Sequence, residues 1–152
     1  MDKLELKVPP VAVFIVSLLL IYLADKVNTF DIELPFSWLV FAVCFVASGY
    51  FGLSGIWAFK KAGTTVNPVE IEKASAVVDS GVYRFSRNPM YLGLLLLLIG
   101  YGYLQQNLLS LLVSVLFVLY MNRFQITPEE SFLQLKFADD YTRYKEKVRR
   151  WI

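Results

Sequence analysis

The sequence is constrained most by four apolar runs that are separated by polar connections. They span about residues 8–24, 36–59, 89–104 and 108–124. An α-helix needs about 20 apolar residues to cross a hydrocarbon core of roughly 30 Å, so these runs are of the order required for membrane spans. The hydrophobic residues, 57% of the chain, fall in blocks and do not alternate as in a membrane barrel. We therefore predict an all-α polytopic membrane protein with four transmembrane helices, forming a single domain over residues 1–152.

The last two runs predict a helical hairpin, because only Gln105-Gln106-Asn107 separates them. Each run is short for a span, which leaves open whether its ends project into the cytosol or the hairpin is tilted or crosses incompletely. The second run carries small residues, including Ser48, Gly49 and Gly52, that permit close helix contact. Packing within the chain is the simpler interpretation, and a helix-packed homodimer is the alternative.

Basic residues predict the orientation. They are concentrated in the loop over residues 60–88 and in the tail after residue 122, whereas the connection from Asp25 to Pro35 is mainly acidic. Because basic residues accumulate on the cytoplasmic side, both termini are expected in the cytoplasm. No small-x-small cleavage site follows the first run, so we interpret it as a membrane anchor and not as a signal peptide.

Residues 128–151 predict a C-terminal amphipathic cytoplasmic helix. Its apolar stripe has the three- and four-residue spacing of a helix face, and consists of Leu133, Phe137, Tyr141, Tyr144, Val148 and Trp151. The stripe is expected to lie against the membrane or the bundle. The basic residues fall largely on the opposite face, where they would meet lipid headgroups or water.

Composition excludes several function classes. The net charge of +2, from 15 basic and 13 acidic residues, is too balanced for nucleic-acid binding. The sequence has no histidine, which removes the commonest general base and metal ligand, so no metal site is expected. The single cysteine, Cys44, lies inside an apolar run and is interpreted as a core residue.

Two polar segments adjoin the hairpin, and the hairpin should bring them together at the cytoplasmic face. In the first, Asn88 followed by Pro89 is typical of a helix start, in which Asn88 would cap the helix. The same helix N-terminus beside Arg84 and Arg87 also suits an anionic group such as a carboxylate. Capping and binding can coexist.

The second segment has the pattern of a capping box that starts the tail helix, Thr127-Pro128-Glu129-Glu130. Glu130, however, lies three residues before Leu133 and therefore on the apolar stripe, pointing inward. A carboxylate that faces away from water needs a partner. A polar pocket between the two segments is therefore predicted.

Taken in order, these residues resemble the isoprenylcysteine carboxyl methyltransferase and phospholipid methyltransferase families of membrane enzymes. The resemblance covers roughly residues 60–152, with a hairpin between the two matching groups. The matching residues are Gly81, Tyr83, Arg87, Asn88, Pro89, Tyr91, Gly93, Glu129, Glu130, Leu133, Phe137, Tyr141, Tyr144 and Arg149. Residues 62–68 also resemble the segment that precedes this motif in bacterial relatives, so a prokaryotic inner membrane is expected.

The resemblance implies S-adenosyl-L-methionine in a cytoplasm-facing pocket, S-adenosyl-L-homocysteine as the product, and a lipid or other lipophilic small-molecule acceptor that arrives from the bilayer. The implied cofactor-binding residues are Tyr83, Arg87, Asn88, Pro89, Tyr91, Gly93, Glu129 and Glu130, with Gly100 and Gly102 as an approximate Gly-x-Gly match. Arg87 and Asn88 would hold the methionine part of the cofactor, and one of the two glutamates its amino or ribose groups. Tyr91 would shape the pocket, and Arg123 would orient an anionic acceptor.

The chain departs from the family pattern in three places. Asn88 stands where the carboxyl methyltransferases have histidine, Ala138 stands where glycine usually follows the phenylalanine, and there are fewer spans than in larger members. Asn88 makes a prenylated substrate doubtful, although an amide can still donate to a carboxylate. Methyl transfer mainly requires alignment of the nucleophile with the methyl group, which needs no histidine.

Two other function classes are alternatives. A small transporter would normally need an ionisable group inside a span, and none of the four apolar runs contains one at its centre. A non-catalytic membrane scaffold would need neither an inward glutamate nor paired arginines at one face. Methyl transfer to a lipophilic or membrane-associated acceptor is therefore the favoured function.

Overall fold

The computed structural model describes residues 5–27, 32–65 and 72–152, and all of the regular structure in these ranges is helical. The elements are α1 (Pro10–Val27), α2 (Ser37–Lys61), the 3₁₀ helix η2 (Gly81–Arg84), α3 (Pro89–Leu104), α4 (Leu108–Tyr120), the π-helix η3 (Met121–Ile126) and α5 (Thr127–Lys147). The predicted all-α class is confirmed. The predicted runs match these helices to within a few residues, and α3 has the predicted bounds.

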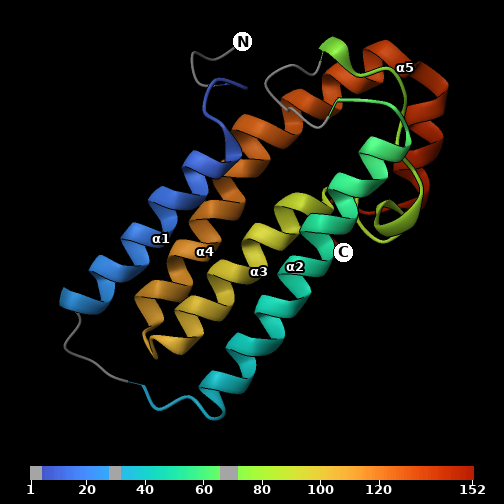
Figure 1. The fold of residues 1–152 in the computed structure, drawn as a ribbon. Coiled ribbons are helices and arrows are strands. Elements are labelled where there is room, and N and C mark those ends of the chain that lie inside the picture. The colour runs from blue at the N-terminus through green and yellow to red at the C-terminus, as the bar shows by residue number, and fades with distance from the viewer. Residues whose placement is uncertain (1–4, 28–31, 66–71) are drawn as a thin grey trace.

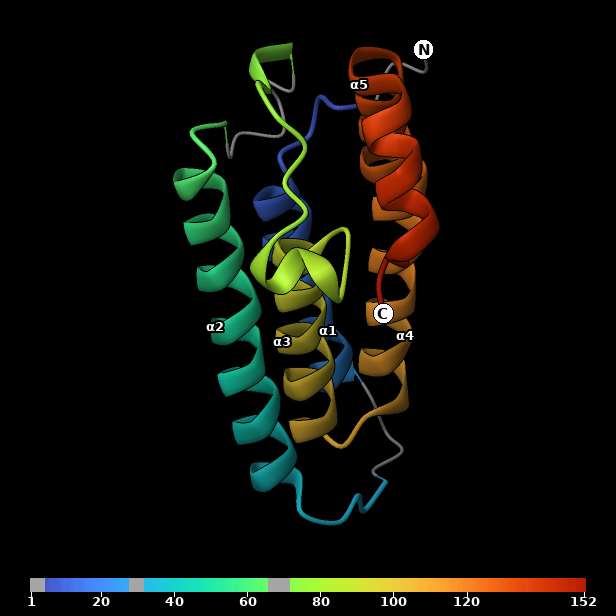
Figure 2. The ribbon, with the colours of Figure 1, turned by 90° about the vertical axis from the view of Figure 1, so that its right-hand side faces the viewer.

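The four apolar helices form an elongated bundle. α2 packs along α3, α3 packs against α4, and α4 packs against α1, so that α1 and α2 lie at the two edges of the view in Figure 1. Helix α5 continues beyond the end of α4 and lies at the same end of the bundle as the C-terminal end of α2, with the segment that leads into α3 between them in Figure 2 (compare Figure 1). The polar segments on either side of the hairpin therefore meet at one end of the bundle.

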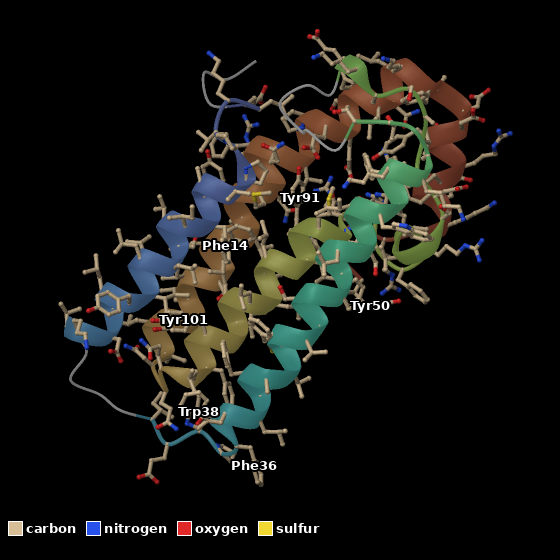
Figure 3. The ribbon with its side chains drawn as sticks, viewed as in Figure 1. Phe14, Phe36, Trp38, Tyr50, Tyr91 and Tyr101 are labelled. Carbon is tan, nitrogen blue, oxygen red and sulfur yellow. The ribbon has the colours of Figure 1, made fainter. Side chains whose placement is uncertain are left out.

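The bundle has the surface of a membrane protein. By length and composition, α1, α2 and the helix that begins at Leu108 can each cross a bilayer, whereas α3 is shorter, with 16 residues. Large apolar side chains on α2 point outward, among them Val46 and Leu53 with about 70% of their surface exposed. Figure 3 places Phe36 and Trp38 together at the end of the bundle opposite Tyr91, where an aromatic residue suits the headgroup region. The chain is thus a polytopic integral membrane protein.

Small residues allow α2 and α3 to approach closely. A Cβ atom on Gly93 would lie 2.9 Å from the Ser48 carbonyl oxygen, and one on Gly100 would lie 2.6 Å from Cys44 Cβ. Both distances are too short for a side chain, so glycine is required by the packing. A Cβ on Gly49 would meet nothing within 4 Å. The predicted packing between helices within the chain is confirmed, while the homodimer stays a prediction.

The junction between α4 and α5 corrects the sequence analysis. Thr127 caps no new helix: its backbone is helical (φ −62°, ψ −45°), its N–H donates to the Asn122 carbonyl, and its hydroxyl donates to the same oxygen at 2.7 Å. The capping box is wrong because the π-helix carries the chain from α4 into α5 without a break, leaving no unpaired N–H groups for a cap to satisfy.

The predicted amphipathic helix over residues 128–151 also needs correction. It is interrupted at Ala138, whose backbone (φ 40°, ψ −109°) is not helical, and it ends at Lys147. This positive φ is the conformation that glycine adopts most readily, which accounts for the glycine that the family pattern has at this position. Because of the interruption, the second half of α5 changes direction.

Candidate active site

The two polar segments predicted to meet are in contact. The Tyr91 hydroxyl, in the first turn of α3, donates a hydrogen bond of 2.6 Å to Glu129 Oε1, in the first turn of α5. Figure 3 shows Tyr91 at the end of the bundle where α3 and α5 adjoin. The contact follows from the hairpin, which returns the chain to the same membrane face after two helices of similar length.

A cavity of about 690 Å³ lies beside this contact, in the size range of small-molecule sites. Its walls come from the start of α1, the second half of α2, residues 74–78, η2, the start of α3 and both halves of α5. Six of the predicted site residues line it: Tyr83, Arg87, Asn88, Tyr91, Glu129 and Glu130. Apolar side chains such as Ile56 and Leu94 form most of the remaining wall.

A charged cluster closes the polar end of the cavity. Glu130, 8% exposed, accepts two hydrogen bonds from Arg87, from Nη2 at 2.6 Å and from Nε at 3.2 Å. Arg150 binds the same carboxylate through Nε and through Nη2, the latter at 2.5 Å to Oε2. Burial alone would raise the pKa of Glu130, but the hydrogen bonds and charges of the two arginines outweigh it and lower the pKa below its usual value. The inward glutamate therefore has the partners that were predicted for it.

Arg87 also donates hydrogen bonds to backbone carbonyls. Its Nη1 donates to the Val148 carbonyl at 2.6 Å and to the Lys145 carbonyl at 3.4 Å. With Glu130 as its third partner, four of the five guanidinium N–H groups are used. Few donors are thus left for an anionic ligand in the cavity.

Asn88 stands at the start of α3 without capping it. The side chain makes no capping hydrogen bond, and its Nδ2 instead donates to the Arg150 carbonyl at 2.9 Å. The expected cap is therefore wrong, because a partner from another part of the chain takes the amide. The Asn88 Oδ1 atom accepts no hydrogen bond from the described residues. It is therefore available as a hydrogen-bond acceptor for a ligand in the cavity.

Glu129 differs from Glu130 because its hydrogen-bond partners are neutral groups. Its Oε1 accepts from Tyr91 and from Gln125, and the described residues give Oε2 no hydrogen-bond donor. Burial is the main cause that raises the pKa of Glu129 to about 7, the charge of Glu130 adds to this rise, and the two hydrogen bonds act against it. Near neutral pH this carboxyl exchanges between its neutral and ionised forms.

The other predicted site residues lie outside the cavity lining. Pro89 is buried in the first turn of α3, and Gly93 and Gly100 face α2. Gly102 faces Ser110 of α4, where an added Cβ would lie 3.3 Å from the serine Cβ. Arg123 forms an ion pair of 2.8 Å with Glu5, and half of its side chain is exposed. The structure thus brings six of the eleven predicted residues together around one cavity.

Sequence reasoning missed two polar groups of the site. Gln125, 2% exposed, donates to Glu129 and lies within 3.5 Å of the Tyr91 hydroxyl. Arg150 binds Glu130, whereas Arg149, which fits the basic end of the family pattern, has an exposed side chain. The four-residue spacing from Gln125 to Glu129 was a usable signal for the first. No local signal distinguishes Arg150 from Arg149.

The chemistry of the cavity follows from these contacts. Arg87 is the only basic side chain among the described lining residues, and it is already paired with Glu130. The cavity also has two acceptors that are not used by the described residues, Glu129 Oε2 and Asn88 Oδ1, beside the aromatic rings of Tyr83, Tyr91 and Tyr141. Carboxylates and aromatic faces both attract cations. The polar end therefore suits a cationic group, next to apolar walls that suit hydrocarbon.

These features define the chain as a helical membrane protein with a ligand-sized cavity at one membrane face. Comparison with known proteins identifies its family. The sequence pattern of the phospholipid methyltransferase family matches residues 37–140, from the start of α2 into α5. This is more than half of the chain, and the chain belongs to that family.

Individual relatives agree with this assignment. The chain is 34% identical over 79 residues to the protein-S-isoprenylcysteine O-methyltransferase of Schizosaccharomyces pombe. It is 36% identical over 77 residues to the protein-S-isoprenylcysteine O-methyltransferase of Saccharomyces cerevisiae. These matches cover about half of the chain but only 32% of each yeast protein. An uncharacterized protein of Haemophilus influenzae is 49% identical over 63 residues, which is 41% of the chain and all of that relative. No solved structure matches significantly.

Proposed function

We propose that this protein transfers a methyl group from S-adenosyl-L-methionine to a lipophilic acceptor at the cytoplasmic face of a prokaryotic inner membrane. Its family and the two yeast relatives support methyl transfer as the reaction class. The observation that carries the proposal is the Glu129 carboxylate, which faces a cavity with one oxygen unused. The positive charge of the loop over residues 60–88 and of the tail supports a cytoplasmic position.

The lining residues fit this cofactor. When bound, S-adenosyl-L-methionine supplies a methyl group on a positively charged sulfur. A nucleophile that attacks this methyl group would release S-adenosyl-L-homocysteine. Of the two glutamates we assign Glu129 to the cofactor, because Glu130 is already bound by two arginines. Glu129 Oε2 and Asn88 Oδ1 would accept from its amino group, and the tyrosine rings would surround its cationic part.

The chain's residues would accelerate transfer mainly by alignment. Tyr91 and Gln125 hold Glu129 in a single orientation from one side, which fixes whatever the carboxylate binds. The tyrosine rings and the apolar walls would surround the bound reactants. Placing two reactants in line can contribute several kcal/mol, up to about 7 to 11 in favourable cases.

The acceptor would enter from the bilayer. Pro10 and Val11 of α1, Gly52 and Ile56 of α2, and Leu94 of α3 line the cavity on its apolar side, in helices whose outer surfaces face lipid. Because no unpaired basic side chain lies among the described lining residues, an acceptor with a free carboxylate finds few donors there. We therefore propose a neutral or amine-bearing lipid-like acceptor.

Calorimetric titration of the detergent-purified protein with S-adenosyl-L-homocysteine tests the proposal. We expect one-to-one binding that Glu129→Gln abolishes, because the amide replaces the anionic acceptor without changing the size of the side chain. Glu146→Gln, on the exposed side of the same helix, is the matched control and should bind like wild type. Absence of binding in wild-type protein that is shown to be folded would refute the proposal and favour a non-catalytic scaffold.

A further inference from the structure

The last residues of the chain form a segment that lies across the start of α3, and we call residues 148–152 the C-terminal strap. Helix α5 ends at Lys147, and Val148 then adopts an extended backbone (φ −126°, ψ 133°). From there the chain turns back, and it ends beside the segment that leads into α3 (Figure 2). Although the strap is not a regular element, its position is fixed by many contacts.

Three successive carbonyls of the strap bind one short segment, residues 86–88. The Val148 carbonyl accepts from Arg87 Nη1 at 2.6 Å, and the Arg149 carbonyl accepts from the Arg87 backbone N–H at 3.0 Å. The Arg150 carbonyl accepts from Asn88 Nδ2 at 2.9 Å and from the Ser86 hydroxyl at 3.4 Å. The strap thus fixes the backbone and the side chains of the segment that carries Arg87 and Asn88 into the cavity.

Two side chains of the strap reach other parts of the site. Arg150 binds the Glu130 carboxylate, and the Trp151 indole N–H donates to Asn122 Oδ1 at 3.0 Å. The Trp151 ring packs on the buried cluster that includes Tyr91 and Met121. The strap is therefore joined to the segment that leads into α3, to the π-helix and to α5. The first and the last of these carry Arg87, Asn88 and Glu130 of the cavity lining.

We propose that the C-terminal strap assembles the polar end of the cavity and that Arg150 is a positioning residue, acting on ligands through Glu130 and Asn88. Arg150 is not among the cavity-lining residues, but its side chain and its carbonyl hold two residues that are. Without its guanidinium, Glu130 Oε2 would lose its partner at a site where little water reaches it. The carboxylate would then no longer be held in one orientation, and Arg87 would shift with it.

The test compares Arg150→Gln with Arg150→Lys and with Lys147→Gln, which removes the same charge from an exposed position nearby. Two quantities are measured in detergent: S-adenosyl-L-homocysteine affinity between pH 5.5 and 8, and hydrogen exchange at the Arg87 amide. The binding measurement rests on the proposed function, whereas the exchange measurement does not. Thermal midpoints are recorded for every variant.

We expect Arg150→Gln to weaken binding by about ten- to a hundredfold, as for loss of a hydrogen bond to a charged group. The loss should be larger at low pH, because removing Arg150 removes an interaction that lowers the pKa of Glu130. Exchange at the Arg87 amide should become faster, Arg150→Lys should restore part of both properties, and Lys147→Gln should match wild type.

Equal affinity and equal exchange in Arg150→Gln and Lys147→Gln would overturn the proposal. So would a loss of affinity accompanied by faster exchange throughout the bundle and a lower thermal midpoint, since the strap would then only stabilise the fold. If wild-type protein binds no S-adenosyl-L-homocysteine, the proposed function fails, but the exchange comparison still decides whether the strap fixes residues 86–88.

Discussion

Glu129→Gln should make the protein more stable at alkaline pH while abolishing cofactor binding. In the folded protein the pKa of Glu129 is raised from 4.5 to about 7 by burial, whereas in the unfolded chain it returns to its ordinary value. Between these two pH values the folded state binds more protons than the unfolded state. The free energy of unfolding therefore falls as the pH rises through this range.

The size of the effect follows from the displacement of the pKa. A change from 4.5 to about 7 corresponds to about 3 kcal/mol, fully expressed near pH 8 and reduced to about 1 kcal/mol at pH 5. Glutamine resembles the protonated acid and can still accept from Tyr91 and Gln125. The variant should therefore exceed wild type by about 3 kcal/mol at pH 8 and by much less at pH 5.

Denaturant unfolding in detergent at pH 5 and pH 8 measures this difference. The range from pH 5 to pH 8 suits this measurement because the sequence contains no histidine, whose titration would otherwise dominate in this range. Glu146→Gln controls for the loss of a carboxylate from the same helix. If the stability difference between Glu129→Gln and wild type is the same at both pH values, the assignment of a raised pKa to Glu129 is wrong.

Three further predictions concern single contacts. Glu130→Gln leaves Arg87 and Arg150 without their shared anion and should lower the free energy of unfolding by about 3 to 5 kcal/mol, measured with denaturant at pH 7.5. Tyr91→Phe removes a hydrogen bond that lowers the pKa of Glu129, so the pH at which cofactor binding is half-maximal should rise; an unchanged binding profile would contradict the contact. Gly100→Ala should reduce stability by about 1 to 3 kcal/mol because its Cβ meets Cys44. Gly49→Ala, whose Cβ would meet nothing within 4 Å, should not lower the unfolding midpoint, because alanine also favours the helix over glycine.

The arrangement of the helices could be predicted because apolar runs determine spans directly. A turn of three residues after Leu104 forces the next helix to return, and this alone places Tyr91 near Glu129. The inward position of Glu130 followed from its spacing to Leu133 on one helix face. These inferences needed only periodicity and chain connectivity, both of which are local properties of a sequence.

The contacts of the C-terminal strap could not be predicted in this way. Its carbonyls bind residues more than sixty positions earlier, and a backbone carbonyl has no residue type that would mark it. The continuous helix through Thr127 was missed for a related reason. A cap residue and a helical threonine look alike in sequence, and what decides between them is whether the preceding π-helix still supplies carbonyl acceptors.

The helical path from Leu108 to Phe137 continues through the π-helix without a break, and it carries Glu129 and Glu130. At about 1.5 Å per residue these residues extend over about 45 Å, which is more than the thickness of the hydrocarbon core, so part of the path lies in lipid and part outside. Helices tilt when lipid chains become shorter or longer. A tilt of the part in lipid would displace Glu129 and Glu130 relative to Tyr91 of α3 and to Arg87, which precedes α3. We therefore expect ligand affinity in reconstituted membranes to vary with the acyl-chain length of the lipid. The optimum should be the bilayer thickness at which Tyr91 still binds Glu129 and Arg87 still binds Glu130.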